Sequence, residues 1–345
     1  EESRRGFYRG GQEAGRLLSE TNPKDALILG ILDGPEASYA SFKRGVSQKV
    51  GRTFHAVQMV KRGTALDIVA GKQWLAADLL SQAYVKATRK PAWTLANPAG
   101  ERVGNAYLAF DVSRRQEFLY EERDELRPAT SVIRKEASAI ASVCDEYGRI
   151  IKWDTYPSHS GETLGRDEAW NILIRAVDDI VEVRGRDFRR LVVYKDGPIR
   201  DTELVFLRSA AQEVVDDFSS EKGRPIRIDF VGVVKSGVER VFRREDNRFA
   251  NPERGTFVVM ADQTCLICAS QPRRGTTNPI RLEYRASVGG DSYPMDALIQ
   301  EFSDLSYLDW RSVYLQPKTP LILQLVQSLG ELLTLDIETP TYIPL

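Results

Sequence analysis

The sequence predicts an α/β protein built from two regions. A length of 345 residues allows two domains or one large α/β unit with an ample core. Apolar runs alternate with helical stretches at first, whereas from about residue 102 several strands follow one another. Residues 1–100 carry a charge of +6 and the remainder −7, although a chance surface bias would give the same difference. Residues 91–104, rich in Pro and Gly, are the expected linker.

The first region alternates strands and helices. Residues 25–34 form an apolar run that ends in Asp-Gly, which is typical of a parallel strand, and 36–50 have helical character. Residues 52–60 are a second strand candidate, and 72–90 have helical periodicity up to Pro91. This order predicts a doubly wound β-α-β-α unit.

The second region begins with three expected strands, at 106–115, 138–148 and 149–157, joined by turn residues as in an antiparallel meander. Residues 166–185 have the apolar spacing of an amphipathic helix, and 189–197 form a buried strand. The remaining elements follow in order: a helix at 201–218, a strand at 226–237, further strands to about 287, and helices at 294–308 and 320–333.

Composition excludes several classes of protein. A net charge of −1 argues against a uniformly basic nucleic-acid binder. No apolar run approaches the roughly eighteen residues of a membrane-spanning helix, so we expect no membrane partner. Three cysteines cannot form a disulfide framework and favour a reducing, cytoplasmic compartment. Cys265 and Cys268 form a single C-x-x-C, for which core packing is favoured over a metal site. The start EESRRGFYRGG, with neither Met nor a signal sequence, indicates a fragment.

Two strands of the second region end in an acid, Asp111 and Asp196. Three strands, a helix and a further strand, with Asp ending the first and fourth strands, is the order of a ribonuclease H-like fold. Such enzymes hold two divalent cations about 4 Å apart, which activate a water and stabilise the leaving oxygen of a phosphodiester. The alternative is that both acids cap turns, since Asp before Gly commonly forms one.

Several segments carry a family pattern. AFDVSRR has the form of a strand with a catalytic Asp, and VVYKDGPIRDTEL that of a strand ending in Asp-Gly before a helix. VGVVKSGVERVFR, NPERGTFVV and TTNPIRLEY follow, and then LSYLDWRSVYLQPKTPLILQLVQSL, with its Trp, Pro and helix. In this order they resemble the MID–PIWI portion of a prokaryotic Argonaute over nearly the whole chain. The resemblance implies a Rossmann-like MID domain at 1–100 and a ribonuclease H-like PIWI domain at 101–345.

By this resemblance Asp111 and Asp196 are catalytic members of a metal-binding tetrad, with Mg²⁺ or Mn²⁺ as cofactor. Glu162, in the loop SHSGETLG, matches the glutamate that swings into the site, although a solvated loop residue is the alternative. The fourth position falls on Gln327, with Glu331 one turn later on the same helical face. An amide adds no negative charge, so the tetrad is expected to be incomplete and metal affinity low.

A phosphate site is expected in the first region. Tyr39 and Lys43 lie four residues apart at the start of a helix, where a Lys and a phenol favour phosphate binding. The resemblance implies that this pair holds the 5′-phosphate of a guide strand, completed by Gln58 on the next strand and Lys86 on the following helix. His55 competes for the strand position. Taken singly, each residue is equally typical of a surface or core edge.

Three further residues are implied by the resemblance. Many prokaryotic members bind a divalent cation through their C-terminal carboxylate, here that of Leu345, for which a packed terminal strap is the alternative. Lys235 and Arg240 are expected to contact guide phosphates, each adding about one unit to the salt dependence of binding.

The expected function is binding of a short 5′-phosphorylated guide that pairs with a complementary target strand, without cleavage because of Gln327. One alternative is an active guide-dependent endonuclease that uses Asp111, Glu162, Asp196 and an unrecognised fourth ligand. Another is a guide-binding sensor subunit for an associated effector protein. If the chain is an unrelated α/β protein that resembles Argonautes by chance, none of these three functions applies.

Overall fold

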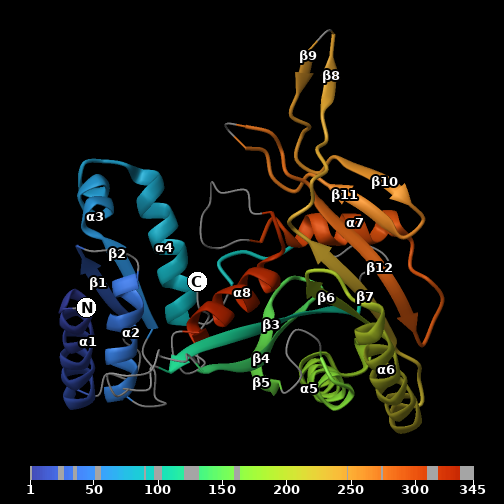
Figure 1. Ribbon diagram of the computed structural model, residues 1–345, viewed down its shortest axis with the longest axis horizontal. Coiled ribbons are helices and arrows are strands. Elements are labelled where there is room, and N and C mark those ends of the chain that lie inside the picture. Colours follow the sequence, from blue (N-terminus) through green and yellow to red (C-terminus); the bar gives the residue numbers. More distant parts are fainter. Residues whose placement is uncertain are drawn as a thin grey trace, which may run out of the picture. The chain divides into compact units, whose positions relative to one another are not determined.

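The computed structural model describes residues 2–21, 27–33, 37–50, 56–88, 91–96, 103–119, 132–158, 164–246, 248–272, 275–308 and 318–334. These residues form two compact units, each of which is described here by itself (Figure 1). The first contains the described residues up to Trp93, and the second those of Thr94–Leu308 together with residues 318–334.

The first unit alternates helices and strands. It contains α1 (Glu2–Thr21), β1 (Leu27–Leu32), α2 (Ala37–Val50), β2 (Ala56–Lys61), α3 (Arg62–Val69) and α4 (Gln73–Thr88). β1 and β2 pair in parallel, with Leu27 opposite Ala56. The predicted β-α-β-α order is confirmed, and α1 and α3 are additions to it.

Glycines allow α1 and α2 to pack closely. A Cβ at Gly11 would lie 2.0 Å from the carbonyl oxygen of Phe42, and a Cβ at Gly45 would lie 2.2 Å from that of Tyr8. The two backbones therefore approach too closely for any side chain at these positions. Because Gly disfavours a helix by about 1 kcal/mol relative to Ala, contact with α2 rather than local preference stabilises α1.

A mixed eight-stranded sheet organises the second unit. In spatial order its strands are β10 (Phe257–Ala261), β11 (Thr264–Ile267), β12 (Ile280–Val288), β7 (Arg227–Val234), β6 (Arg190–Asp196), β3 (Asn105–Leu119), β4 (Val132–Asp145) and β5 (Ile150–Ser158). β3, β4 and β5 form the predicted antiparallel meander. β6 and β7 run parallel to β3. β3 and β4 are longer than predicted because they pair with each other from Ala106–Asp145 to Leu119–Val132.

Helices cover both faces of this sheet (Figure 1). α5 (Arg166–Arg184) and α6 (Asp201–Lys222) pack on one face. On the opposite face, Tyr194 of β6 contacts Phe302 of α7 (Met295–Leu305), with ring centroids 5.7 Å apart. α8 (Leu321–Thr334) packs against β3, β4 and β6. None of the helices in the described part of the chain has the length and apolar character needed to cross a membrane.

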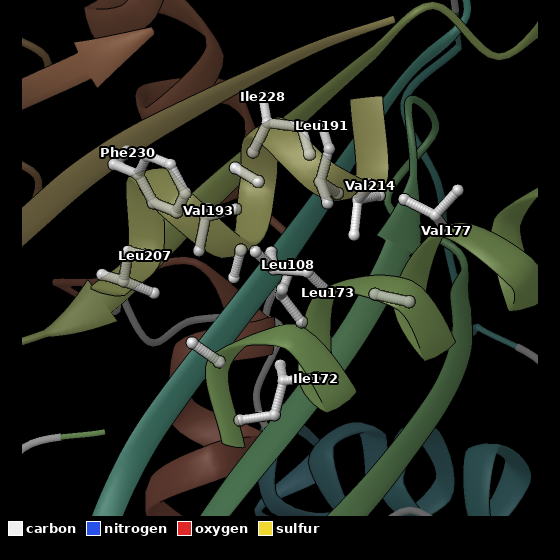
Figure 2. Close-up of a cluster of buried hydrophobic side chains, with 14 of the residues drawn as sticks. Leu108, Ile172, Leu173, Val177, Leu191, Val193, Leu207, Val214, Ile228 and Phe230 are labelled. Carbon is white, nitrogen blue, oxygen red and sulfur yellow. The ribbon is translucent and has the colours of Figure 1, made fainter. Parts of the chain in front are cut away.

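The main core lies between the sheet and the first of these helix layers. Apolar side chains from β3, β6 and β7 meet apolar side chains from α5 and α6. Figure 2 shows the members of this cluster, which include Leu108, Leu191, Val193, Ile228 and Phe230 from the strands and Ile172, Leu173, Val177, Leu207 and Val214 from the helices. Alternate residues of the strands supply this face, which follows from the two-residue repeat of a strand.

A buried polar cluster ties β3, β6, β7 and α7 together near the amino ends of β3 and β6. The Arg190 guanidinium binds Asp229 and donates from Nη1 to both carboxylate oxygens of Glu301 at 2.9 Å. Asn105 also donates to Glu301 at 2.9 Å, and the Tyr284 hydroxyl donates to Asp229 at 2.8 Å. Burial alone would lower the pKa of Arg190, but the two carboxylates raise it above its ordinary value.

A separate hairpin, β8 (Arg243–Glu245) and β9 (Arg248–Ala250), completes the strands of this unit. Cys265 on β11 and Cys268 just after it are buried free thiols. Burial raises their pKa to about 12 and about 11. In the described ranges, no three His, Cys, Asp or Glu side chains are grouped to hold a metal ion. Cys265 and Cys268 both lie in the packed interior of the second unit.

Candidate nucleic-acid interface

Asp111 and Asp196 lie side by side on β3 and β6. Asp196 ends β6 as predicted, whereas Asp111 does not end its strand, because β3 continues to pair with β4 as far as Leu119. The two strands are parallel neighbours in which Phe110 pairs with Lys195, so the next residue of each strand is an acid at the same level of the sheet. Burial and the charge of Asp196 raise the pKa of Asp111, while the N–H of Val112, which donates to Oδ1 at 2.8 Å, lowers it. Two partly exposed acids on neighbouring strands thus repel each other.

Backbone bonds fix the turn that follows Asp196. The Gly197 N–H donates to the Val233 carbonyl at 2.9 Å, and the Val233 N–H donates back to Gly197 at 3.1 Å. Gly197 has φ +94°, a conformation that favours glycine. The Asp-Gly pair does form a turn, as the alternative interpretation requires. The Asp196 side chain, however, binds Lys235 rather than this turn.

The Lys235 ammonium joins Asp196 to α8. Lys235 directly follows β7, the neighbour of β6. Its Nζ donates to Asp196 Oδ2 at 2.6 Å and to Gln327 Oε1 at 3.4 Å. We call Asp111, Asp196, Lys235 and Gln327 the carboxylate group. It contains three of the predicted tetrad positions and one predicted guide contact.

As arranged here, the carboxylate group does not fit the expected divalent cations. Mg²⁺ needs oxygen ligands at about 2.0–2.1 Å, whereas Asp196 Oδ2 accepts a hydrogen bond from Lys235. Gln327 offers a neutral oxygen that also accepts from Lys235. Glu162 and Leu345 lie outside the described residues, and only the backbone position of Glu331 on α8 is described.

A second lysine supports the carboxylate group from inside. Lys195 is buried, its ammonium binds the buried Glu203 of α6, and it donates to the Pro198 carbonyl at 3.0 Å. Glu203 also accepts from the Leu164 N–H at 3.5 Å, where the described chain resumes after the loop that contains Glu162. This pair was not predicted from the sequence. The only signal is a Lys beside the strand-end acid and a Glu in the first turn of the next helix.

Arg240 supports the loop that carries Lys235. It is exposed, and its Nη1 donates to the carbonyls of Gly237 and Glu239 at 3.1 and 2.7 Å. It also donates to the Asn278 side chain at 3.1 Å, and Asn278 donates to the Lys235 carbonyl at 3.4 Å. These contacts hold the backbone of Lys235 in place. The predicted contact of Arg240 with a guide stays a prediction.

In the first unit, Tyr39 and Lys43 lie in the first two turns of α2, and both are partly buried. Burial lowers the pKa of Lys43, and no acidic side chain among the described residues opposes this shift. A partly dehydrated ammonium near the start of a helix favours an anionic ligand, because the helix dipole also attracts negative charge there.

Gln58 and Lys86 lie on neighbouring elements of the same unit. Gln58, on β2, is buried and donates from Nε2 to Gln82 Oε1 of α4 at 3.1 Å. Lys86 follows Gln82 by one turn of α4, and its side chain is not described. His55 lies outside the described residues. Gln58 therefore lies beside the helix that carries Lys86.

The comparisons identify the fold. No protein-family model matches the sequence, and the search of curated proteins gave no match. The structure is similar to that of Clostridium butyricum Argonaute bound to a guide DNA (5′ deoxycytidine) and a 19-mer target DNA, with a TM-score of 0.70 and 16% identity. The match covers 97% of this chain and 41% of that Argonaute, so the chain spans about two fifths of its length. The chain thus has an Argonaute-like fold, which confirms the predicted resemblance at the level of the fold.

Proposed function

We propose that the chain binds the 5′-phosphate of a short guide strand and pairs the guide with a complementary target strand without cutting the target. The observation that carries this proposal is the similarity, over 97% of the chain, to an Argonaute that was bound to guide DNA and target DNA. In this proposal base pairing supplies sequence specificity, while the protein contacts the backbone of the strands.

The two units have different roles in the proposed function. Residues 1–100 act as a Rossmann-like MID domain, in which Tyr39, Lys43, Gln58 and Lys86 hold the guide phosphate. Residues 101–345 act as a ribonuclease H-like PIWI domain that carries the carboxylate group. The parallel β1–β2 pair with its helices supports the first assignment. The order β3-β4-β5-α5-β6, with neighbouring acids on β3 and β6, supports the second.

The test of the phosphate site compares guides with 5′-phosphate and 5′-hydroxyl ends, made of DNA and of RNA. Lys43→Ala is expected to weaken binding of the phosphorylated guide roughly tenfold to hundredfold, because a hydrogen bond to a charged group contributes about 1.5–3 kcal/mol. Binding of the hydroxyl guide should change little. Fluorescence anisotropy with labelled guides measures both.

The matched control is Lys72→Ala, which removes an exposed lysine of the same unit that pairs with Asp67. It should leave both affinities unchanged. Equal discrimination between the two guide ends in wild type and Lys43→Ala would reject the phosphate site.

A further inference from the structure

We infer that Lys235 is the built-in cation of the carboxylate group and takes the position in which a divalent metal ion would bind Asp196. The inference depends on the proposed function only for its consequence, which is that the group contacts a target strand without metal-dependent cleavage. The placement of Lys235 is independent of that proposal.

The main observation is that Lys235 hydrogen-bonds to two residues of the carboxylate group. Its Nζ binds one carboxylate oxygen of Asp196 and the side-chain oxygen of Gln327, which come from β6 and α8. An ammonium that donates to two oxygen acceptors from separate elements does what a metal ion does, since it neutralises charge and joins the two side chains. The neutral amide of Gln327 is compatible with an ammonium. Lys235 carries one positive charge, so it needs fewer negative ligands than a divalent ion with two charges.

The charges around the group support the same assignment. Asp111 and Asp196 are neighbours that repel each other, and a cation is needed to hold both near one another. The charge of Lys195 is paired with Glu203, which is buried and directly bound to it. Lys235 binds Asp196 and no other acid among the described residues, so its charge serves the carboxylate group.

The loop after β7 holds Lys235 in this position. Its carbonyl accepts from Asn278, which in turn accepts from Arg240. Glu239 of the same loop accepts from Arg281 of β12 at 3.0 Å. Several side chains therefore fix the backbone at Lys235, so this side chain has less freedom than a lysine on an open surface.

The experiment measures Mn²⁺ binding to the full chain by electron paramagnetic resonance of free Mn²⁺, without nucleic acid. Wild type is expected to show no saturable site at the carboxylate group. Lys235→Met removes the ammonium while keeping the length of the side chain. It should create one saturable Mn²⁺ site where wild type shows none, because the opposing charge is gone.

Two controls locate the new site. Adding Asp196→Asn to Lys235→Met should abolish it. Lys152→Met, which removes a lysine of the same unit that is paired with Asp179, should behave as wild type. Lys235→Gln repeats the neutralisation with a polar side chain, in case Lys235→Met does not fold.

Wild type that binds Mn²⁺ as tightly as the neutral variants would overturn the inference, and so would a folded neutral variant with no new site. Guide binding is a separate measurement. Loss of discrimination between guide ends, together with the expected Mn²⁺ result, would reject the proposed function and leave Lys235 as the cation of the group.

Discussion

A charged side chain is stable inside a protein only when it is paired. Arg190, Asp229 and Glu301 are 2%, 0% and 1% exposed, and they satisfy one another between β6, β7 and α7. Lys195 and Glu203 do the same beside the carboxylate group. Lys235 and Asp196 are more open, with 27% and 17% of their side chains exposed. At this scale the fully buried pairs stabilise the fold, and the half-open pair lies where a ligand can reach it.

Arg190→Met tests the structural role of the buried cluster. It leaves two buried carboxylates without their cation and should lower the free energy of unfolding by about 3–5 kcal/mol. Urea unfolding followed by circular dichroism measures the change. The control Arg166→Met breaks an exposed pair with Glu213 and should cost about 0–1 kcal/mol. Equal losses in the two variants would contradict the role of Arg190.

At the scale of elements, α1 positions α2, and α2 carries Tyr39 and Lys43. The two helices touch where Gly11 faces the backbone of Phe42 and Gly45 faces that of Tyr8. The proposed phosphate site therefore depends on a helix that contributes none of the predicted ligands.

Gly11→Ala should disturb this contact, because the new Cβ would lie 2.0 Å from a backbone oxygen and the helices would have to separate. We expect a loss of stability of about 1–3 kcal/mol and weaker binding of a 5′-phosphorylated guide. Gly6→Ala is the matched control on α1, since nothing lies within 4 Å of its added Cβ. It should be neutral or stabilise by up to about 1 kcal/mol. Thermal melting and anisotropy separate the two variants, and identical behaviour would refute the close-contact argument.

At the scale of the whole molecule, the proposed guide site and the carboxylate group belong to different units, so the proposed function requires both. The chain has a net charge of −1, and a bulk positive charge therefore does not explain strand binding. In the proposed function, contacts such as that of Lys43 with the guide phosphate supply the affinity for the strand. The sensor role with an effector protein stays a prediction.

A cleavage assay tests the whole molecule. With a 5′-phosphorylated guide, a complementary target and Mg²⁺ or Mn²⁺, we expect the target to stay intact, because in our proposal Lys235 takes the place of a metal ion and Gln327 adds no negative charge. Gel electrophoresis of labelled target measures this. DNA and RNA are each tested as the guide and as the target. Product that forms with wild type and disappears in Asp196→Asn would instead establish the endonuclease alternative.

The elements that the sequence predicts well are those with a strong local pattern. β6 and α5 were expected at 189–197 and 166–185 and lie at Arg190–Asp196 and Arg166–Arg184. α1 was not predicted, because its glycines disfavour a helix locally and the helix is stabilised only by its contact with α2. The residues in and around the carboxylate group also differ in how well the sequence predicts them. Asp196 is visible in the sequence as an acid that ends a strand, whereas Asp111 lies inside β3, which its pairing with β4 extends to Leu119. The pairing of Lys195 with Glu203 was not predicted, because the chain turns between β6 and α6.

The sequence by itself determined most of the order of strands and helices, the acid that ends β6 and the Argonaute resemblance, because each rests on residues close together in the chain. Only the tertiary structure decided what that acid faces. Lys235 meets Asp196 across 39 residues and Gln327 across 92. Contacts over such separations arise from the packing of β6, β7 and α8, which no local pattern encodes.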